Sequence, residues 1–198
     1  MTTTLTANQL SGRATGSLFF NGFGALWLVL GLYASQRLDA AAAAVLLVCF
    51  SLLLFAGVQL IKESKRWPHI PNDPAVGRAF GWINLVQWVA VFVVAFTLAK
   101  LNLSVYVMNA ITLIVGLHMF PLARVFRYPM HNATGSALVA WAILSAFIVP
   151  TNQLQGIAAL GTGIILWMAA GITIRRAFND ARKSVPPQAT NMSVSSAI

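Results

Sequence analysis

The stretch LNLSVYVMNAITLIVGLHMFPLA, from Leu101 to Ala123, decides the fold class of this protein. It is an apolar run with one imidazole, His118, and no charged side chain. A helix of about 20 such residues is long enough to cross a bilayer. Ionisable residues are rare inside membrane helices and are often functional. The stretch is therefore predicted to span a membrane, with His118 as the first candidate functional residue.

The whole chain has the composition of an all-α integral membrane protein. Hydrophobic residues make up 58% of the 198 residues and charged residues only 9%, which is too apolar for a soluble globule. In lipid, backbone amides must bond within the structure, so apolar runs of this length are predicted to be helices. Six such spans are expected: Gly16–Tyr33, Ala40–Ile61, Ala79–Ala99, Leu101–Ala123, Ala133–Pro150 and Leu154–Ile174.

The basic residues predict the orientation of these helices. All lysines and arginines except Arg37 and Lys100 fall in the intervals that six crossings place on one side. Such residues concentrate on the cytoplasmic side, so both termini are expected in the cytoplasm and the protein in the bacterial inner (plasma) membrane. Contact with anionic lipid or with a partner is expected for five of them, Lys62, Lys65, Arg66, Arg124 and Arg127. No nucleic-acid partner is expected, because these residues sit at helix ends without a folded module.

A threefold repeat organises the helices into tandem hairpins. Ala14-Thr15-Gly16-Ser17, Ala75-Val76-Gly77-Arg78 and Ala133-Thr134-Gly135-Ser136 open the odd helices at intervals of about sixty residues. The predicted hairpins cover about 14–66, 75–127 and 133–182 of a transmembrane domain at 13–183. A flexible N-terminus at 1–12 and a disordered cytoplasmic tail at 184–198 are expected to flank it.

A polar side chain follows a glycine by two residues in the second helix of each hairpin. These side chains are Gln59, His118 and Thr173. Around a pseudo-threefold axis they would form a ring at one depth and constrict a pore. They could equally be interfacial residues or hydrogen-bond between helices, which contributes about 0.6 kcal/mol each.

His118 has two interpretations of its own. An imidazole with an ordinary pKa of about 6.5 could gate a path in response to pH, or it could stay neutral and bond to a neighbouring helix. Pro121 removes a backbone donor and is expected to kink the helix beside His118.

Further amide side chains lie inside the predicted spans. They are Asn21, Asn84, Gln87 and Asn109. Asn84 and Gln87 share one helical face by their spacing. An amide offers both a donor and an acceptor, so these residues could bind a small polar solute or could join helices together.

Ion coupling, cofactor chemistry and catalysis find no support in the sequence. All four acidic residues lie outside the spans or at their ends, so no buried carboxylate is available to carry protons or sodium. Motifs of metalloproteases, serine hydrolases and redox proteins are absent. His69 and His131 are expected at the surface in loops. We therefore expect neither an enzyme, nor a metal site, nor a cofactor.

The layout of about two hundred residues in six helices and three hairpins resembles two groups of small bacterial membrane proteins. One is the urea/amide channel family and the other is the acid-resistance membrane proteins built from repeated hairpins. Phe20-Asn21-Gly22 is the nearest local similarity to the channel family. That resemblance implies termini facing away from the cytoplasm, which is the reverse of the orientation that the basic residues predict.

Two functions are consistent with these observations. The first is a passive channel or facilitator for a small polar solute. The second is an accessory or stress-response membrane protein that binds a partner or lipid without transporting anything. A homo-oligomer is plausible in either case, because six short helices leave much apolar surface.

Overall fold

The computed structural model describes residues 5–69 and 73–184. Within these ranges it is all-helical, and six helices are each long and apolar enough to cross a membrane. The prediction of six apolar helices is thus confirmed. The helices are α1 (Ala7–Ala34), α2 (Ala40–Ser64), α3 (Pro74–Lys100), α4 (Val107–Val125), α5 (Met130–Ile148) and α6 (Leu154–Lys183), with a short 3-10 turn η1 (Ser104–Tyr106) before α4.

The first helix begins earlier than the apolar pattern predicts. Residues 7–12, expected as part of a flexible N-terminus, form its first turns. Thr6 and Gln9 make a reciprocal capping box, which satisfies two free backbone donors. Leu10 is fully buried in a cluster with Leu60 and Trp67. Of the predicted tail at 184–198, all but Ser184 lies outside the described residues.

Acidic residues and left-handed turns fix the ends of several other helices. The side chains of Asp39 and Asp73 accept hydrogen bonds from the first turns of α2 and α3. Gln36, Asn102 and Arg127 follow α1, α3 and α4 with positive φ angles of 49–57°. This is the left-handed conformation in which a helix commonly terminates.

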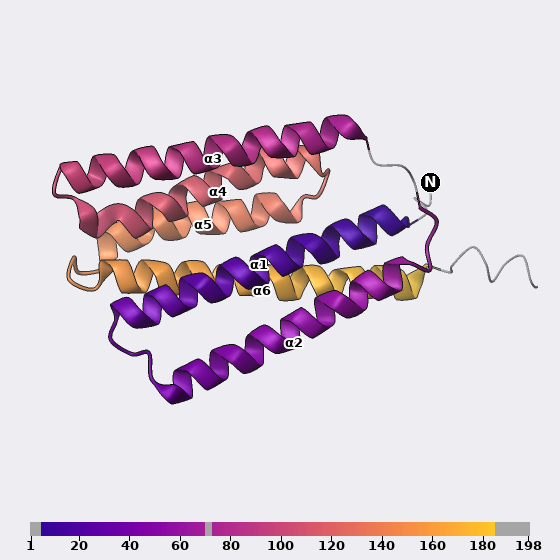
Figure 1. Ribbon diagram of the computed structural model, residues 1–198, viewed down its shortest axis with the longest axis horizontal. Coiled ribbons are helices and arrows are strands. Elements are labelled where there is room, and N and C mark those ends of the chain that lie inside the picture. Colours follow the sequence, from indigo (N-terminus) through magenta and orange to yellow (C-terminus); the bar gives the residue numbers. More distant parts are fainter. Residues whose placement is uncertain (1–4, 70–72, 185–198) are drawn as a thin grey trace, which may run out of the picture.

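The helices pack in the spatial order α2, α1, α6, α5, α4, α3 (Figure 1). Consecutive helices pair as hairpins, and α1 against α6 and α4 against α5 join different hairpins. A closed threefold ring would also need α2 against α3. Among the described residues these two helices do not pack together, so the arrangement is open on that side.

Close contacts between glycine backbones hold the centre of the bundle. A Cβ atom on Gly163 would lie 2.8 Å from the carbonyl oxygen of Gly24, and one on Gly31 would lie 3.0 Å from that of Gly156. Small residues let membrane helices approach in this way, which explains why α1 and α6 lie so close. Gly116 and Gly135 do the same for α4 and α5.

Hydrogen bonds and large side chains complete the centre. The hydroxyls of Thr112 on α4 and Thr162 on α6 are 2.7 Å apart, and both residues are fully buried. Around them lies an apolar cluster from α1, α4, α5 and α6, namely Phe20, Trp27, Met119, Leu122, Leu138, Ala159, Leu166, Ala169 and Ala170. The space between these four helices is thus filled by side chains.

Candidate binding groove between α3 and α4

A groove of about 440 Å³ runs between α3 and α4, and we call it the α3–α4 groove. Its walls are mostly apolar, and two of its lining residues, Gln87 and His118, are polar. Trp82 and Leu117 at its rim are 67% and 51% exposed, so it opens on the side of the bundle. The lining residues are Trp82, Ile83, Val86, Gln87 and Ala90 from α3 and Ile114, Leu117, His118 and Pro121 from α4.

His118 is the polar residue on the α4 wall. Its side chain is half-buried, both ring nitrogens are shielded from solvent, and neither has a hydrogen-bond partner in the described part of the chain. Leaving buried polar atoms unpaired is unfavourable. A turn of the imidazole toward the groove would let one of these nitrogens bond to a small molecule there.

Pro121 leaves one backbone carbonyl of α4 without its usual helical donor. It lies inside α4 and has no N–H to donate to the carbonyl of Leu117, four residues earlier. Leu117 and Pro121 both line the α3–α4 groove. The lining side chains of the groove thus include the amide of Gln87 and the imidazole of His118.

The structure places His118 in the groove with Gln87, but Gln59 and Thr173, the other two members of the predicted ring, do not line it. Thr173 is buried on α6, and its hydroxyl accepts a 3.4 Å hydrogen bond from Tyr128. Gln59 is half-buried on α2. No hydrogen bond among the described residues joins Gln59, His118 and Thr173 to one another.

Two of the remaining amides join neighbouring helices. Asn109 on α4 donates to the hydroxyl of Ser145 at 2.7 Å and to the carbonyl of Ala142 at 3.1 Å, both on α5. Asn21 on α1 donates to the carbonyl of Phe50 on α2 at 3.0 Å. Both amides are almost fully buried, and their oxygens have no hydrogen-bond partner among the described residues.

Asn84 makes only a local bond. Its amide donates to the carbonyl of Phe80, one turn earlier in the same helix, at 2.8 Å. It does not line the α3–α4 groove, although it lies one turn from Gln87. The predicted polar face of α3 is therefore divided, with Gln87 in the groove and Asn84 bonded to its own helix.

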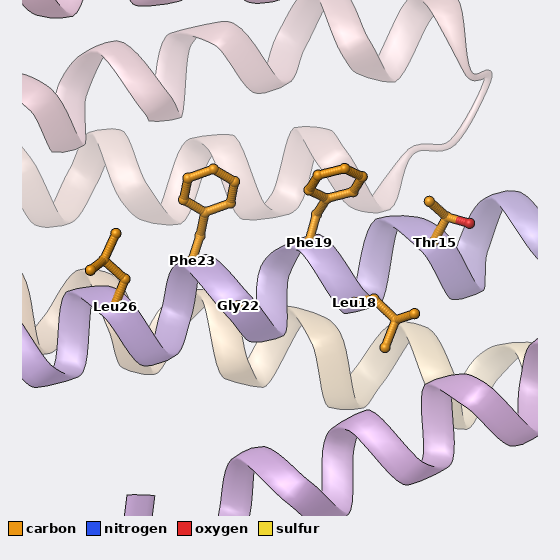
Figure 2. Close-up of a pocket in the computed structure, with 6 residues that line it drawn as sticks. All are labelled: Thr15, Leu18, Phe19, Gly22, Phe23 and Leu26. Carbon is orange, nitrogen blue, oxygen red and sulfur yellow. The ribbon is translucent and has the colours of Figure 1, made fainter. Parts of the chain in front are cut away.

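A second groove, of about 420 Å³, is formed by α1 alone. Figure 2 shows Phe19 and Phe23 pointing to the same side of the helix and Leu18 to another. Thr15 supplies the only hydroxyl among the residues that line it, and no candidate site residue reaches it. Its chemistry is that of a lipid-facing surface.

Except for Arg37 and Lys100, the basic residues of the described segments lie at the end of the bundle where α1, α3 and α5 begin, which we call the basic end. Arg13 and Asp180 form an ion pair there at 2.6 Å, and Arg66 pairs with Glu63 at 3.1 Å. All five predicted contact residues are exposed at this end, namely Lys62, Lys65, Arg66, Arg124 and Arg127. Arg66 is the only one of these five with an ion pair among the described residues.

His131 is not the surface loop residue that the sequence predicts. It lies in the first turn of α5, half-buried. Its ring meets those of Phe20 and Tyr128 edge to face at centroid distances of 5.7 and 5.3 Å. The neighbouring prolines suggested a loop, but Pro129 instead occupies the helix N-cap position.

Several structural features were not predicted from the sequence. The Thr112–Thr162 contact and the aromatic surroundings of His131 depend on which helices are neighbours. The apolar walls of the α3–α4 groove are indistinguishable in sequence from lipid-facing residues.

Within the described ranges, no group of three or more His, Cys, Asp or Glu side chains could hold a metal ion.

Comparisons with protein-family models, with curated proteins and with solved structures found no significant match.

Proposed function

We propose that this protein is a passive facilitator for a small polar solute in the inner membrane, with both termini in the cytoplasm. Three tandem hairpins would form its membrane domain. The observation that carries the proposal is the α3–α4 groove, in which Gln87 and the unpaired His118 meet. Polar groups inside a membrane protein commonly mark a substrate path.

The packing of the bundle favours this groove as the path. The space between α1, α4, α5 and α6 is filled by the central apolar cluster. The groove has room for a small molecule and has hydrogen-bonding groups on both walls. A solute that leaves water would replace part of its hydration with the Gln87 amide, and with the His118 ring once that ring turns toward the groove.

The positions of the acidic residues favour passive movement. Asp39 and Asp73 cap helices, and Glu63 and Asp180 pair with arginines at the basic end. None of the four carboxylates lies along the groove. Coupling to protons or sodium would need such a group inside the membrane.

Stopped-flow light scattering on proteoliposomes tests the proposal. Vesicles holding wild type, His118→Ala or Thr173→Val would be challenged with a panel of small neutral solutes at pH 7.5 and pH 5. We expect flux of at least one solute above that of empty liposomes, its loss in His118→Ala and its retention in Thr173→Val. Absence of flux for every solute would refute the proposal.

A second candidate function is binding of a partner or an anionic lipid by a protein that transports nothing. The exposed cations at the basic end favour it, because most of them have no ion pair among the described residues. Neutralising Lys62, Lys65 and Arg66 together should then abolish binding to anionic vesicles or to the partner. Unchanged binding would reject this function.

A further inference from the structure

The α3–α4 groove opens on the side of the bundle and runs over much of the depth of one leaflet. Trp82 and Leu117 at its rim are exposed, and its α3 wall extends from Trp82 to Ala90. At 1.5 Å per residue this wall covers about 12 Å. Half of the hydrocarbon core of a bilayer is about 15 Å thick. The groove therefore has the length of an acyl chain that enters it from the surrounding membrane.

Two arginines continue the rims of the groove toward the basic end. Arg78 precedes Trp82 by four residues on α3, and Arg124 follows Leu117 by seven residues on α4. Residues at these intervals lie on the same side of a helix. Each arginine is therefore in line with one rim, and both are exposed.

An aromatic contact brings the two arginine-bearing segments together. The ring centroids of Phe80 and Phe126 are 5.6 Å apart, and each phenylalanine follows one of the arginines by two residues. Arg78 and Arg124 are thus carried by adjoining segments at the same level of the bundle. Neither has an ion pair among the described residues. Asp73, the acidic residue nearest to Arg78 in sequence, caps the first turn of α3 instead.

We propose that the α3–α4 groove binds one anionic phospholipid, with its phosphate between Arg78 and Arg124 and an acyl chain along the apolar walls. Arginine suits this ligand, because its guanidinium forms paired hydrogen bonds with phosphate oxygens. Basic pockets between membrane helices bind anionic headgroups in this way. Trp82, one turn from Arg78, is the kind of amphipathic aromatic residue that lies at headgroup depth. The inference goes beyond the proposed facilitator and does not rest on it.

The groove on α1 shows what the arginines add. It has nearly the same volume, about 420 Å³, and its lining is mostly apolar. Arg13, the one basic residue of α1, is already paired with Asp180. An acyl chain can lie in either groove, but of the two the α3–α4 groove has a pair of unpaired cations in line with its rims. We therefore expect an anionic lipid to be held between α3 and α4 and to exchange freely along α1.

Native mass spectrometry with added lipid tests the headgroup site. The full-length protein in detergent would be titrated with phosphatidylglycerol, which is anionic, and with zwitterionic phosphatidylcholine. We expect the first phosphatidylglycerol to bind about tenfold more tightly, and this preference to disappear in Arg78→Gln/Arg124→Gln. Lys62→Gln/Lys65→Gln removes two exposed cations from the same end and should keep the preference. An unchanged preference in the arginine variant, or equal loss in both variants, would overturn the proposal.

The position of the acyl chain needs a test of its own. Ala90→Phe places a large ring at the far end of the groove, and Ala99→Phe places one on the same helix outside it. The affinity for phosphatidylglycerol should fall in Ala90→Phe and stay unchanged in Ala99→Phe. Glycerol 3-phosphate, which has the phosphate but no chain, should not compete. Equal affinity of the two variants, or competition by glycerol 3-phosphate, would contradict a chain bound in the groove.

The lipid site and the facilitator can fail independently. A lipid preference that depends on the arginines, in a protein without solute flux, would keep the lipid site and reject the facilitator. Solute flux in a protein without that preference would keep the facilitator and reject the lipid site. An acyl chain and a solute cannot occupy the groove at the same time, so if both proposals hold, flux should be lower in phosphatidylglycerol vesicles than in phosphatidylcholine vesicles.

Discussion

Helices α1 and α3 would be equivalent in a threefold repeat, yet the structure uses them differently. Both are long, apolar and the first helix of a hairpin. Helix α1 packs between α2 and α6 and buries residues along its whole length, whereas α3 packs mainly on α4 and buries none. Apolar composition therefore says that a helix lies in the membrane, but not whether protein or lipid surrounds it.

This difference has a functional consequence. Where glycine backbones touch, as between α1 and α6, no space remains for a ligand. Helix α3 packs against α4 through large side chains and without a close glycine contact, and a groove forms between them. The predictions below compare matched residues of α1 and α3, beginning with the largest expected effect.

The tryptophans of the two helices give the largest contrast. Trp27 is 7% exposed in the central cluster and Trp88 is 48% exposed. Trp27→Ala should lower the free energy of unfolding by about 3 kcal/mol, because it leaves a cavity in a packed core. Trp88→Ala should lower it much less. Denaturation in mixed micelles followed by circular dichroism measures both, and equal losses would contradict the contrast between α1 and α3.

Glycine substitutions give the next contrast. A methyl group on Gly31 would lie 2.7 Å from the backbone nitrogen of Leu160, while one on Gly81 would meet nothing within 4 Å. Gly31→Ala should therefore cost about 1–3 kcal/mol by overpacking. Gly81→Ala should be neutral or stabilising, since alanine favours a helix by up to about 1 kcal/mol. The midpoint of the same unfolding transition reports both, and a neutral Gly31→Ala would disprove the close α1–α6 contact.

The asparagines should differ by less. Asn21 bonds across to α2, and Asn84 bonds to its own helix. Asn21→Leu should cost about 0.6 kcal/mol, the average for a hydrogen bond between membrane helices, and Asn84→Leu should cost almost nothing. Replicate unfolding titrations can resolve this difference. If Asn84→Leu lowered the free energy of unfolding more than Asn21→Leu, Asn84 would have to bond to a partner outside its own helix.

The arginines should show the smallest effect. Arg13 pairs with Asp180, but both side chains are partly exposed, at 23% and 46%. Arg13→Gln should lower the free energy of unfolding by only about 0.2–0.5 kcal/mol, because the ion pair is partly exposed, and high salt should remove the difference. Arg78 has no ion pair in the described part of the chain, so Arg78→Gln should leave the melting temperature unchanged. A salt-independent loss in Arg13→Gln would point to its contact with the ring of Tyr128, 5.3 Å away.

The helices of this fold are predictable from its sequence, but their exact ends are not. Hydropathy located all six helices, because chains that span a membrane must be apolar for about 20 residues. It missed the first turns of α1 and the last turns of α6, which are more polar. In these turns Leu10 and Ala177 are fully buried in one apolar cluster at the basic end. Tertiary packing therefore extends both helices.

The site was predictable only in part. Gln87 and His118 were identified as polar residues inside apolar spans, which is a signal visible in sequence. These two residues line one groove because α3 packs against α4, and the sequence does not show that packing. The repeat instead grouped His118 with Gln59 and Thr173, residues that lie on other helices with other neighbours. Periodicity places residues on a helix, whereas pairing of helices is decided by shape.

Selective blockage of the α3–α4 groove is the most direct test of its role. In protein lacking Cys49, Leu117→Cys places a thiol at the rim of the groove, and Ile172→Cys places one on α6 outside it. Proteoliposomes would be treated with a small methanethiosulfonate reagent before stopped-flow measurement of solute entry. We expect the reagent to abolish flux through Leu117→Cys and to leave Ile172→Cys unaffected. Unchanged flux through fully labelled Leu117→Cys would show that the solute does not pass along α3 and α4.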